Sequence, residues 1–207
     1  GSEMCIRDRQ GSKLARFWFL NWKAQGSMIQ SRPDLAFGPI LYAMHTLSRG
    51  VLNLTAQMPP LGEKEAQAVR LDAKNVSGKW MRRGIARIDP LSRTATFRIK
   101  GWEDSRDVAY RIAFEDRKKD GSTSESYFEG VIRKDPIDKK EVVVAGFTGN
   151  QDTAFPNTRL VENVGIMNPD LLFFSGDQIY EGVGGYGIHR TPVELATLNY
   201  LRKIYLW

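Results

Sequence analysis

The chain has 207 residues, which is enough for one substantial hydrophobic core or two small ones. Hydrophobic residues make up 42% of it and charged residues 26%, a composition typical of folded chains and unlike that of disordered ones. No apolar run approaches the roughly 20 residues of a membrane-spanning helix, so we expect no membrane span.

The net charge of +6 is unevenly distributed. From residue 141 onward four basic residues stand against seven acidic ones, so this part carries −3 and residues 1–140 carry +9. In the basic part, Lys and Arg alternate with apolar residues, which is typical of a solvated sheet face. We find no nucleic-acid-binding motif. The single cysteine, Cys5, allows no intrachain disulfide and does not indicate the compartment.

The first 50 residues give little functional information. Residues 1–10, which begin Gly-Ser and continue SEMCIRDR, resemble a cloning or sequencing artefact and are set aside. Residues 11–50 are expected to be a helix and loop-rich segment. Within it, Leu14–Gln30 is aromatic-rich with a helix-compatible pattern, and Ser31–Gly50 is predicted to be a loop-rich connection. No export signal is visible.

Residues 51–137 contain short segments of alternating polarity separated by turn signals. In one of them, Ala95, Phe97 and Ile99 point to one face, while the residues between them point to the other. Period-two strands at this spacing predict an antiparallel β-sandwich. The predicted strands are Val51–Met58, Ala68–Asn75, Lys79–Ile88, Thr94–Gly101, Val108–Glu115 and Tyr127–Arg133.

Residues 138–207 have a different pattern. Val142–Phe147 and Leu171–Phe174 are continuous apolar runs, as expected of buried parallel strands. A helical pattern lies between them and is stopped by Asn168 and Pro169. A second helix is predicted from a capping box in which Thr191 is the N-cap, Pro192 follows it and Glu194 is the third helical residue. This order predicts the first βαβα unit of an α/β domain with a parallel sheet, which makes the whole chain α+β.

The second apolar run ends in Ser-Gly-Asp, which places Asp177 at the carboxyl end of a strand. Open α/β sheets bind ligands at that edge. Asp177 offers a hard carboxylate, and Tyr180 offers a phenolate to an iron-like trivalent metal. An aspartate that bridges two metals can position a hydroxide for attack on phosphorus. The alternative is an ordinary Gly-Asp turn with Tyr180 packed in the core; the preceding apolar run and the Ile-Tyr-Glu continuation favour the metal interpretation.

The segment PDLLFFSGDQIYE (Pro169–Glu181) resembles the GD-x-x-Y-E block of alkaline phosphatase D-like enzymes, members of the calcineurin-like metallophosphoesterase superfamily. The likeness covers roughly residues 50–207, including the sandwich and the strand VVVAGF with its turn TGNQD. It implies that Asp177 bridges two metals and that Tyr180 binds iron. It further implies that the complete enzyme uses iron with calcium or a similar ion, hydrolyses phosphate esters, and is exported to the periplasm or beyond.

Two features depart from that pattern. The family's first metal-binding turn usually carries an Asp or Cys ligand, but Gly149 stands there, so Asn150 or Asp152 is an alternative oxygen ligand. The family's later histidine blocks are also missing, because the only histidines are His45 and His189 and neither lies in such a block. We therefore interpret the chain as an N-terminal fragment whose phosphoesterase domain (138–207) is truncated.

The expected function is that of a fragment of a phosphomonoesterase or phosphodiesterase, in which a metal-bridged hydroxide attacks a small-molecule phosphate ester. His189 and Arg190 are weaker candidates for phosphate contact. The glycines of residues 182–187 lack the Lys-Ser/Thr of a nucleotide-binding loop, so a flexible rim is the favoured interpretation. The alternative function is a non-catalytic β-sandwich module, for binding or structure, with a degenerate phosphoesterase tail.

Aromatic residues of the predicted sandwich leave a further alternative open. Trp80, Trp102 and Tyr127 are candidates for a sugar-binding face, although packing in the core or in turns is the favoured interpretation.

Overall fold

The computed structural model describes residues 23–30, 38–118, 120–149, 157–180, 182 and 188–205. The chain separates into two compact units, Gly1–Ala36 and Phe37–Trp207. The helical pattern predicted at Leu14–Gln30 lies mostly outside the described residues, and its described part, residues 23–30, contains a turn and no helix. None of the helices in the described ranges is long and apolar enough to cross a membrane.

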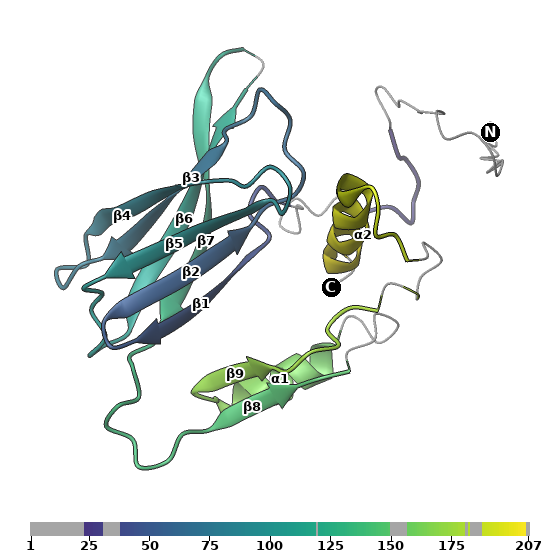
Figure 1. Ribbon diagram of the computed structural model, residues 1–207. Coiled ribbons are helices and arrows are strands. Elements are labelled where there is room, and N and C mark those ends of the chain that lie inside the picture. The colour runs from purple at the N-terminus through teal and green to yellow at the C-terminus, as the bar shows by residue number, and fades with distance from the viewer. Residues whose placement is uncertain are drawn as a thin grey trace. The chain divides into compact units, whose positions relative to one another are not determined.

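Two antiparallel sheets form a β-sandwich in the second unit (Figure 1). One sheet has the strand order β1-β2-β5 and the other has the order β4-β3-β6-β7. The prediction of an antiparallel sandwich is confirmed, since each of the six predicted strands overlaps one of β2–β7. The strands are β1 Tyr42–Ser48, β2 Val51–Gln57, β3 Ala68–Lys74, β4 Trp80–Arg87, β5 Thr94–Lys100, β6 Val108–Arg117 and β7 Thr123–Ile132.

The first strand, β1, lies in the segment Ser31–Gly50 that the sequence predicted to be loop-rich, so the sandwich begins at Tyr42 and not at Val51. It pairs with β2 along its whole length across the two-residue turn Arg49-Gly50. Both turn residues have positive φ values, 50° and 69°, as a type I′ hairpin turn requires. The strand escaped prediction because exposed Met44 and polar His45 obscure its alternation.

The core of the sandwich is built from every second residue of the predicted strands. Leu52 and Leu54 of β2, Leu71 of β3 and Ile112 of β6 are fully buried. Burying each such side chain contributes about 1.5–3 kcal/mol. Gly130 of β7 belongs to the same packing, because a Cβ there would lie 2.7 Å from the ring of Tyr110 on β6.

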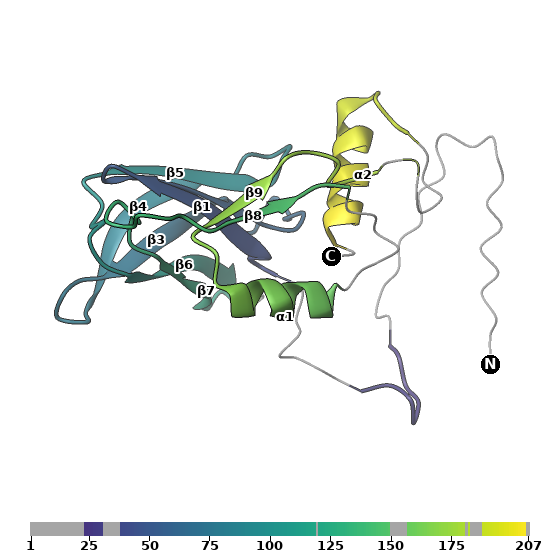
Figure 2. The same cartoon turned by 90° about the horizontal axis from the view of Figure 1, so that it is seen from below.

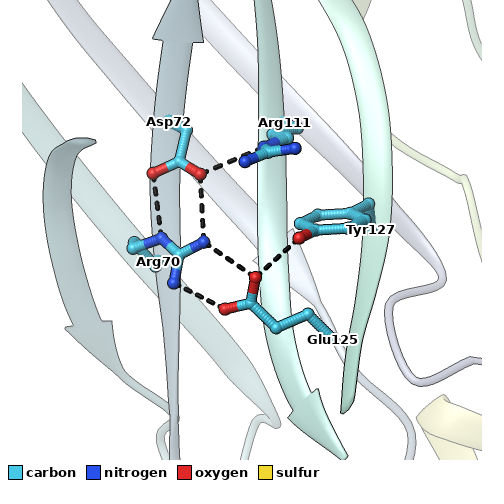
Figure 3. Close-up of polar contacts among 5 residues, drawn as sticks. All are labelled: Arg70, Asp72, Arg111, Glu125 and Tyr127. Carbon is cyan, nitrogen blue, oxygen red and sulfur yellow. Dashed lines mark hydrogen bonds and ion pairs between the residues drawn. The ribbon is translucent and has the colours of Figure 1, made fainter. Parts of the chain in front are cut away.

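A charged network crosses the outer face of the four-stranded sheet (Figure 3). The side chain of Asp72 on β3 is only 5% exposed and accepts hydrogen bonds from Arg70 (2.9 and 3.1 Å) and Arg111 (3.0 Å). Arg70 also donates to both carboxylate oxygens of Glu125 on β7, at 2.6 and 3.1 Å. The hydrogen bonds from Arg70, and then the one from Tyr127, lower the pKa of Glu125 to about 2. The network thus joins strands β3, β6 and β7.

Arg111 is also held by two aromatic rings. Its guanidinium lies 4.6 Å from the ring centre of Trp80 and 4.3 Å from that of Tyr127, both within cation–π range. Trp102 is buried, at 4% exposure. The burial of Trp102 and the cover of Trp80 by arginine favour the packing interpretation for these two residues. Tyr127 is 45% exposed, with Arg111 over its ring.

We expect Asp72→Asn to lower the free energy of unfolding by about 3 kcal/mol, because Arg111 loses its carboxylate partner and Arg70 keeps only Glu125. Glu115→Gln is the matched control. It breaks the exposed Glu115–Arg117 pair (2.8 Å) and should cost less than about 1 kcal/mol. Urea unfolding followed by circular dichroism measures both. Equal losses of unfolding free energy in the two variants would show that the burial of the network does not add to stability.

The remainder of the second unit has the order strand, helix, strand, helix (Figure 2). Strands β8 (Val144–Phe147) and β9 (Leu171–Phe174) pair in parallel, with Phe147 opposite Phe174. Helix α1 (Thr158–Met167) connects them, and helix α2 (Val193–Tyr205) follows. Helix α1 ends at Asn168, whose left-handed backbone (φ 47°) lets its N–H bond to the carbonyls of Val164 and Gly165. The predicted stop at Asn168 is therefore confirmed.

Two details of this part differ from the prediction. The strands are not buried, because Leu171 and Phe173 are 47% and 55% exposed. A parallel sheet is buried when helices cover both faces, and two strands with one connecting helix are too few to do so within the described residues. Helix α2 begins at Val193, one residue later than predicted, because the carbonyl of Pro192 accepts the N–H groups of Leu195 and Ala196.

The start of β9 is fixed by Asp170, whose side chain is 4% exposed. Its carboxylate accepts hydrogen bonds from the ammonium of Lys139 (2.5 Å) and from the backbone N–H of Val143 (3.1 Å). Arg133, just after β7, donates to the carbonyl of Pro169 at 2.8 Å. These bonds hold the beginning of β9 beside the segment that leads into β8, and so support the parallel register.

Candidate metal site at the carboxyl edge of the β8–β9 pair

The parallel pairing of β8 and β9 brings the residues that follow each strand to one edge. The rings of Phe147 and Phe174, the last residues of the two strands, stack with their centres 5.0 Å apart. After β9 the backbone turns through Gly176 (φ 128°) and Asp177 (φ 53°). A positive φ is uncommon outside glycine, although aspartate tolerates it better than most residues. The turn sets Asp177 at the strand end, as the sequence predicted.

Tyr180 returns to Asp177 after this turn. Its hydroxyl donates a hydrogen bond to Oδ2 of Asp177 at 3.1 Å. A Cβ built on Gly149, just beyond β8, would lie 3.8 Å from the same hydroxyl oxygen. The structure therefore brings together the three positions that the sequence singled out: the two predicted ligands and the glycine that stands where the family's first ligand is expected.

A metal at this edge would be held by the carboxylate of Asp177 and the phenolate of Tyr180, whose oxygens lie 3.1 Å apart. Desolvation, followed by the hydrogen bond to Asp177 and the charge of that carboxylate, raises the pKa of Tyr180 above its ordinary value. Because a metal takes the phenolate form, binding here must displace the phenolic proton.

Gln178 is a member of this site that the sequence analysis missed. Its side-chain amide donates to the carbonyl of Phe147 on β8 (3.3 Å) and to that of Gly176 (2.6 Å). It thereby fastens the turn after β9 to the end of β8. Its place between two predicted ligands was visible in the sequence, but its backbone partners are set by the parallel pairing and were not.

Of the other predicted candidates, two lie outside the described residues and two show no hydrogen bond to Asp177. Asn150 and Asp152 lie outside the described residues, as does most of the glycine-rich segment 182–187. His189 and Arg190 are exposed ahead of α2, and the hydrogen bonds of the described chain link neither to Asp177. Among the described residues no group of three or more His, Cys, Asp or Glu could hold a metal.

His45 belongs to the sandwich. It lies on β1 with its ring edge-on to that of Tyr110, at 6.3 Å between centres. Desolvation lowers its pKa below the ordinary value for histidine. Its ring contacts Tyr110 while the residue as a whole stays exposed on β1.

Comparison with known proteins adds no family assignment. No protein-family model matches the chain, and no curated protein sequence matches it.

We expect Asp177→Asn to lower the pKa of Tyr180 toward its ordinary value, because the negative charge that opposes the phenolate disappears while the desolvation remains. Ultraviolet titration of the phenolate, taken as the difference between each protein and its Tyr180→Phe derivative, isolates this tyrosine. Glu162→Gln on α1 is the control and should leave the titration unchanged. An unchanged titration in Asp177→Asn would mean that the two side chains do not interact in solution.

Proposed function

We propose that the carboxyl edge of the β8–β9 pair is part of a phosphoesterase metal site, and that the chain derives from the alkaline phosphatase D-like hydrolases. The single observation that carries this proposal is the 3.1 Å hydrogen bond between Asp177 and Tyr180. The segment PDLLFFSGDQIYE resembles the metal-binding block of these enzymes, and the resemblance assigns metal-ligand roles to two side chains. The hydrogen bond joins these two side chains.

The two side chains have defined parts in such a site. The carboxylate of Asp177 is a hard oxygen ligand that can bridge two ions, and the phenolate of Tyr180 suits a trivalent ion such as iron. A bound metal would supply Lewis-acid polarisation of a phosphoryl oxygen. Gln178 would keep the turn in place while Tyr180 exchanges its proton for the ion. Arg190 and His189 stay as candidates for contact with the phosphate.

The second candidate is a non-catalytic β-sandwich module with a degenerate phosphoesterase tail. Gly149 favours it, because it has no side chain at a position where a Cβ would lie 3.8 Å from the hydroxyl of Tyr180. The two candidates differ in one measurable respect. If the site is an incomplete metal site, adding the missing ligand raises its metal affinity. If the tail has another use, the added ligand leaves metal affinity unchanged.

We expect the full chain to bind iron or calcium weakly, and Gly149→Asp to raise the affinity by about tenfold or more. The estimate follows because loss of an outer-shell partner alone typically changes metal affinity 10–100-fold. Aspartate tolerates the positive φ of 66° at this position better than most residues do. Isothermal titration calorimetry measures the affinities.

The control for added negative charge is Gly165→Asp on α1, where a Cβ meets no atom within 4 Å. It should leave the affinity as it is. Asp177→Ala in the Gly149→Asp background should abolish the increase in affinity. If Gly149→Asp and Gly165→Asp raise metal affinity equally, the site has no specific geometry and the second candidate is favoured.

A further inference from the structure

Strands β4 and β5, with their connecting turn, concentrate the positive charge of the protein. Residues 79–100 contain seven Lys and Arg against one acidic residue, Asp89, so this stretch alone carries +6. Strands β4 and β5 are edge strands of different sheets, and they contact one another along the same side of the sandwich (Figure 1). We call this surface the basic edge. Its cations are Lys79, Arg82, Arg83, Arg87, Arg93, Arg98 and Lys100.

The cations of the basic edge have few acidic neighbours, although the charge of Arg93 acts on the carboxylate of Asp89. Within the described chain none of the seven forms an ion pair, and six of them are exposed, Arg93 being partly covered. The guanidinium of Arg83 lies 5.3 Å from the ring centre of Trp102, which positions it. The carboxylate of Asp89 is engaged inside its own turn by the N–H groups of Leu91 and Ser92 and the hydroxyl of Ser92.

Protection against edge-to-edge association is the simpler explanation of charged edge strands. It does not require one sign of charge. The other edge of the four-stranded sheet, β7, carries Glu125 and Glu129 and no Lys or Arg, and the other edge strand of the second sheet, β1, carries no Lys, Arg, Asp or Glu. Clustered like charges repel one another and oppose folding. Seven cations along one edge therefore exceed what edge protection needs.

We propose that the basic edge binds a flexible linear polymer whose backbone carries phosphate in every repeat. The exposed residues of the two packed sheets point in opposite directions, so Arg87 of β4 and Arg98 of β5 face away from each other. A flat membrane surface cannot contact both, whereas a flexible chain can bend around the edge. Five of the seven cations are arginines, whose forked guanidinium matches phosphate oxygens in pairs.

The basic edge recognises the charged backbone of the polymer and not its side groups. Proteins that bind single-stranded nucleic acid stack the bases on exposed aromatic rings. Here the ring of Trp80 is covered by Lys74 (5.0 Å) and Arg111 (4.6 Å), and Trp102 is buried. The inference stands apart from the proposed metal site, because it involves neither β8 nor β9.

The test measures binding of labelled inorganic polyphosphate to the full chain by fluorescence anisotropy at increasing salt concentration. The edge variant carries Arg82→Ser, Arg87→Ser, Arg98→Ser and Lys100→Ser. The matched control carries Lys64→Ser, Lys118→Ser, Lys134→Ser and Lys140→Ser, exposed cations elsewhere, and has the same net charge as the edge variant. Circular dichroism verifies that both variants fold.

We expect the edge variant to bind about tenfold or more weakly at low salt. The slope of the logarithm of the binding constant against the logarithm of the salt concentration should become less steep. The change should be about 0.7 for each phosphate group that the variant no longer neutralises. The matched control should stay within about twofold of the parent chain, and Asp177→Ala should bind normally. Equal weakening of the two serine variants would overturn the proposal, because net charge alone would then explain binding. Equally tight binding of polyglutamate or anionic phospholipid vesicles through the same four residues would overturn the assignment to a phosphate polymer.

Discussion

The parallel pairing of β8 with β9 is the constraint on which the candidate site depends. It sets Phe147 opposite Phe174, so the turns after both strands leave the sheet at one edge. Gln178 then bonds across to the carbonyl of Phe147, and Tyr180 folds back onto Asp177 beside Gly149. A one-residue slip of the pairing would turn each side chain of a strand to the opposite face, and would separate these groups. The carboxylate of Asp170 and its partners, Lys139 and Val143, oppose that slip at the other end of β9.

The two parts of the second unit differ in how they are stabilised. The sandwich encloses a core of fully buried side chains and adds the network around Asp72 on one outer face. The β8–α1–β9 part exposes about half of each apolar side chain in β9, and α1 has no buried residue. We therefore expect the sandwich to supply most of the free energy of folding. The two proposed functional surfaces follow the same division, since the basic edge lies on the sandwich and the candidate metal ligands lie in the turn after β9.

Much of the fold was predictable because each sandwich strand has one face in the core, which produces a period of two in the sequence. Strands β2 to β7 were found in this way. Strand β1 was missed, since an edge strand with His45 and Met44 among its residues lacks a clean alternation. An apolar run such as Leu171–Phe174 identifies a strand but does not say what covers it, so its burial was predicted wrongly. Spacing could place Asp177 and Tyr180 at a strand end. The hydrogen bond between them, the closeness of Gly149 and the role of Gln178 depend on a turn with positive φ values and on the partner strand, which lie beyond local sequence patterns.

The central claim is that Asp177 and Tyr180 can share one metal ion. Resonance Raman spectroscopy of the full chain loaded with ferric iron tests it most directly, because only a tyrosinate bound to the iron gives enhanced phenolate vibrations. The account predicts these vibrations in the parent chain, their loss in Tyr180→Phe, and their persistence in Tyr127→Phe, a tyrosine of the sandwich that bonds to Glu125 instead. Phenolate vibrations that survive in Tyr180→Phe, or that are absent from the iron-loaded parent chain, would contradict it.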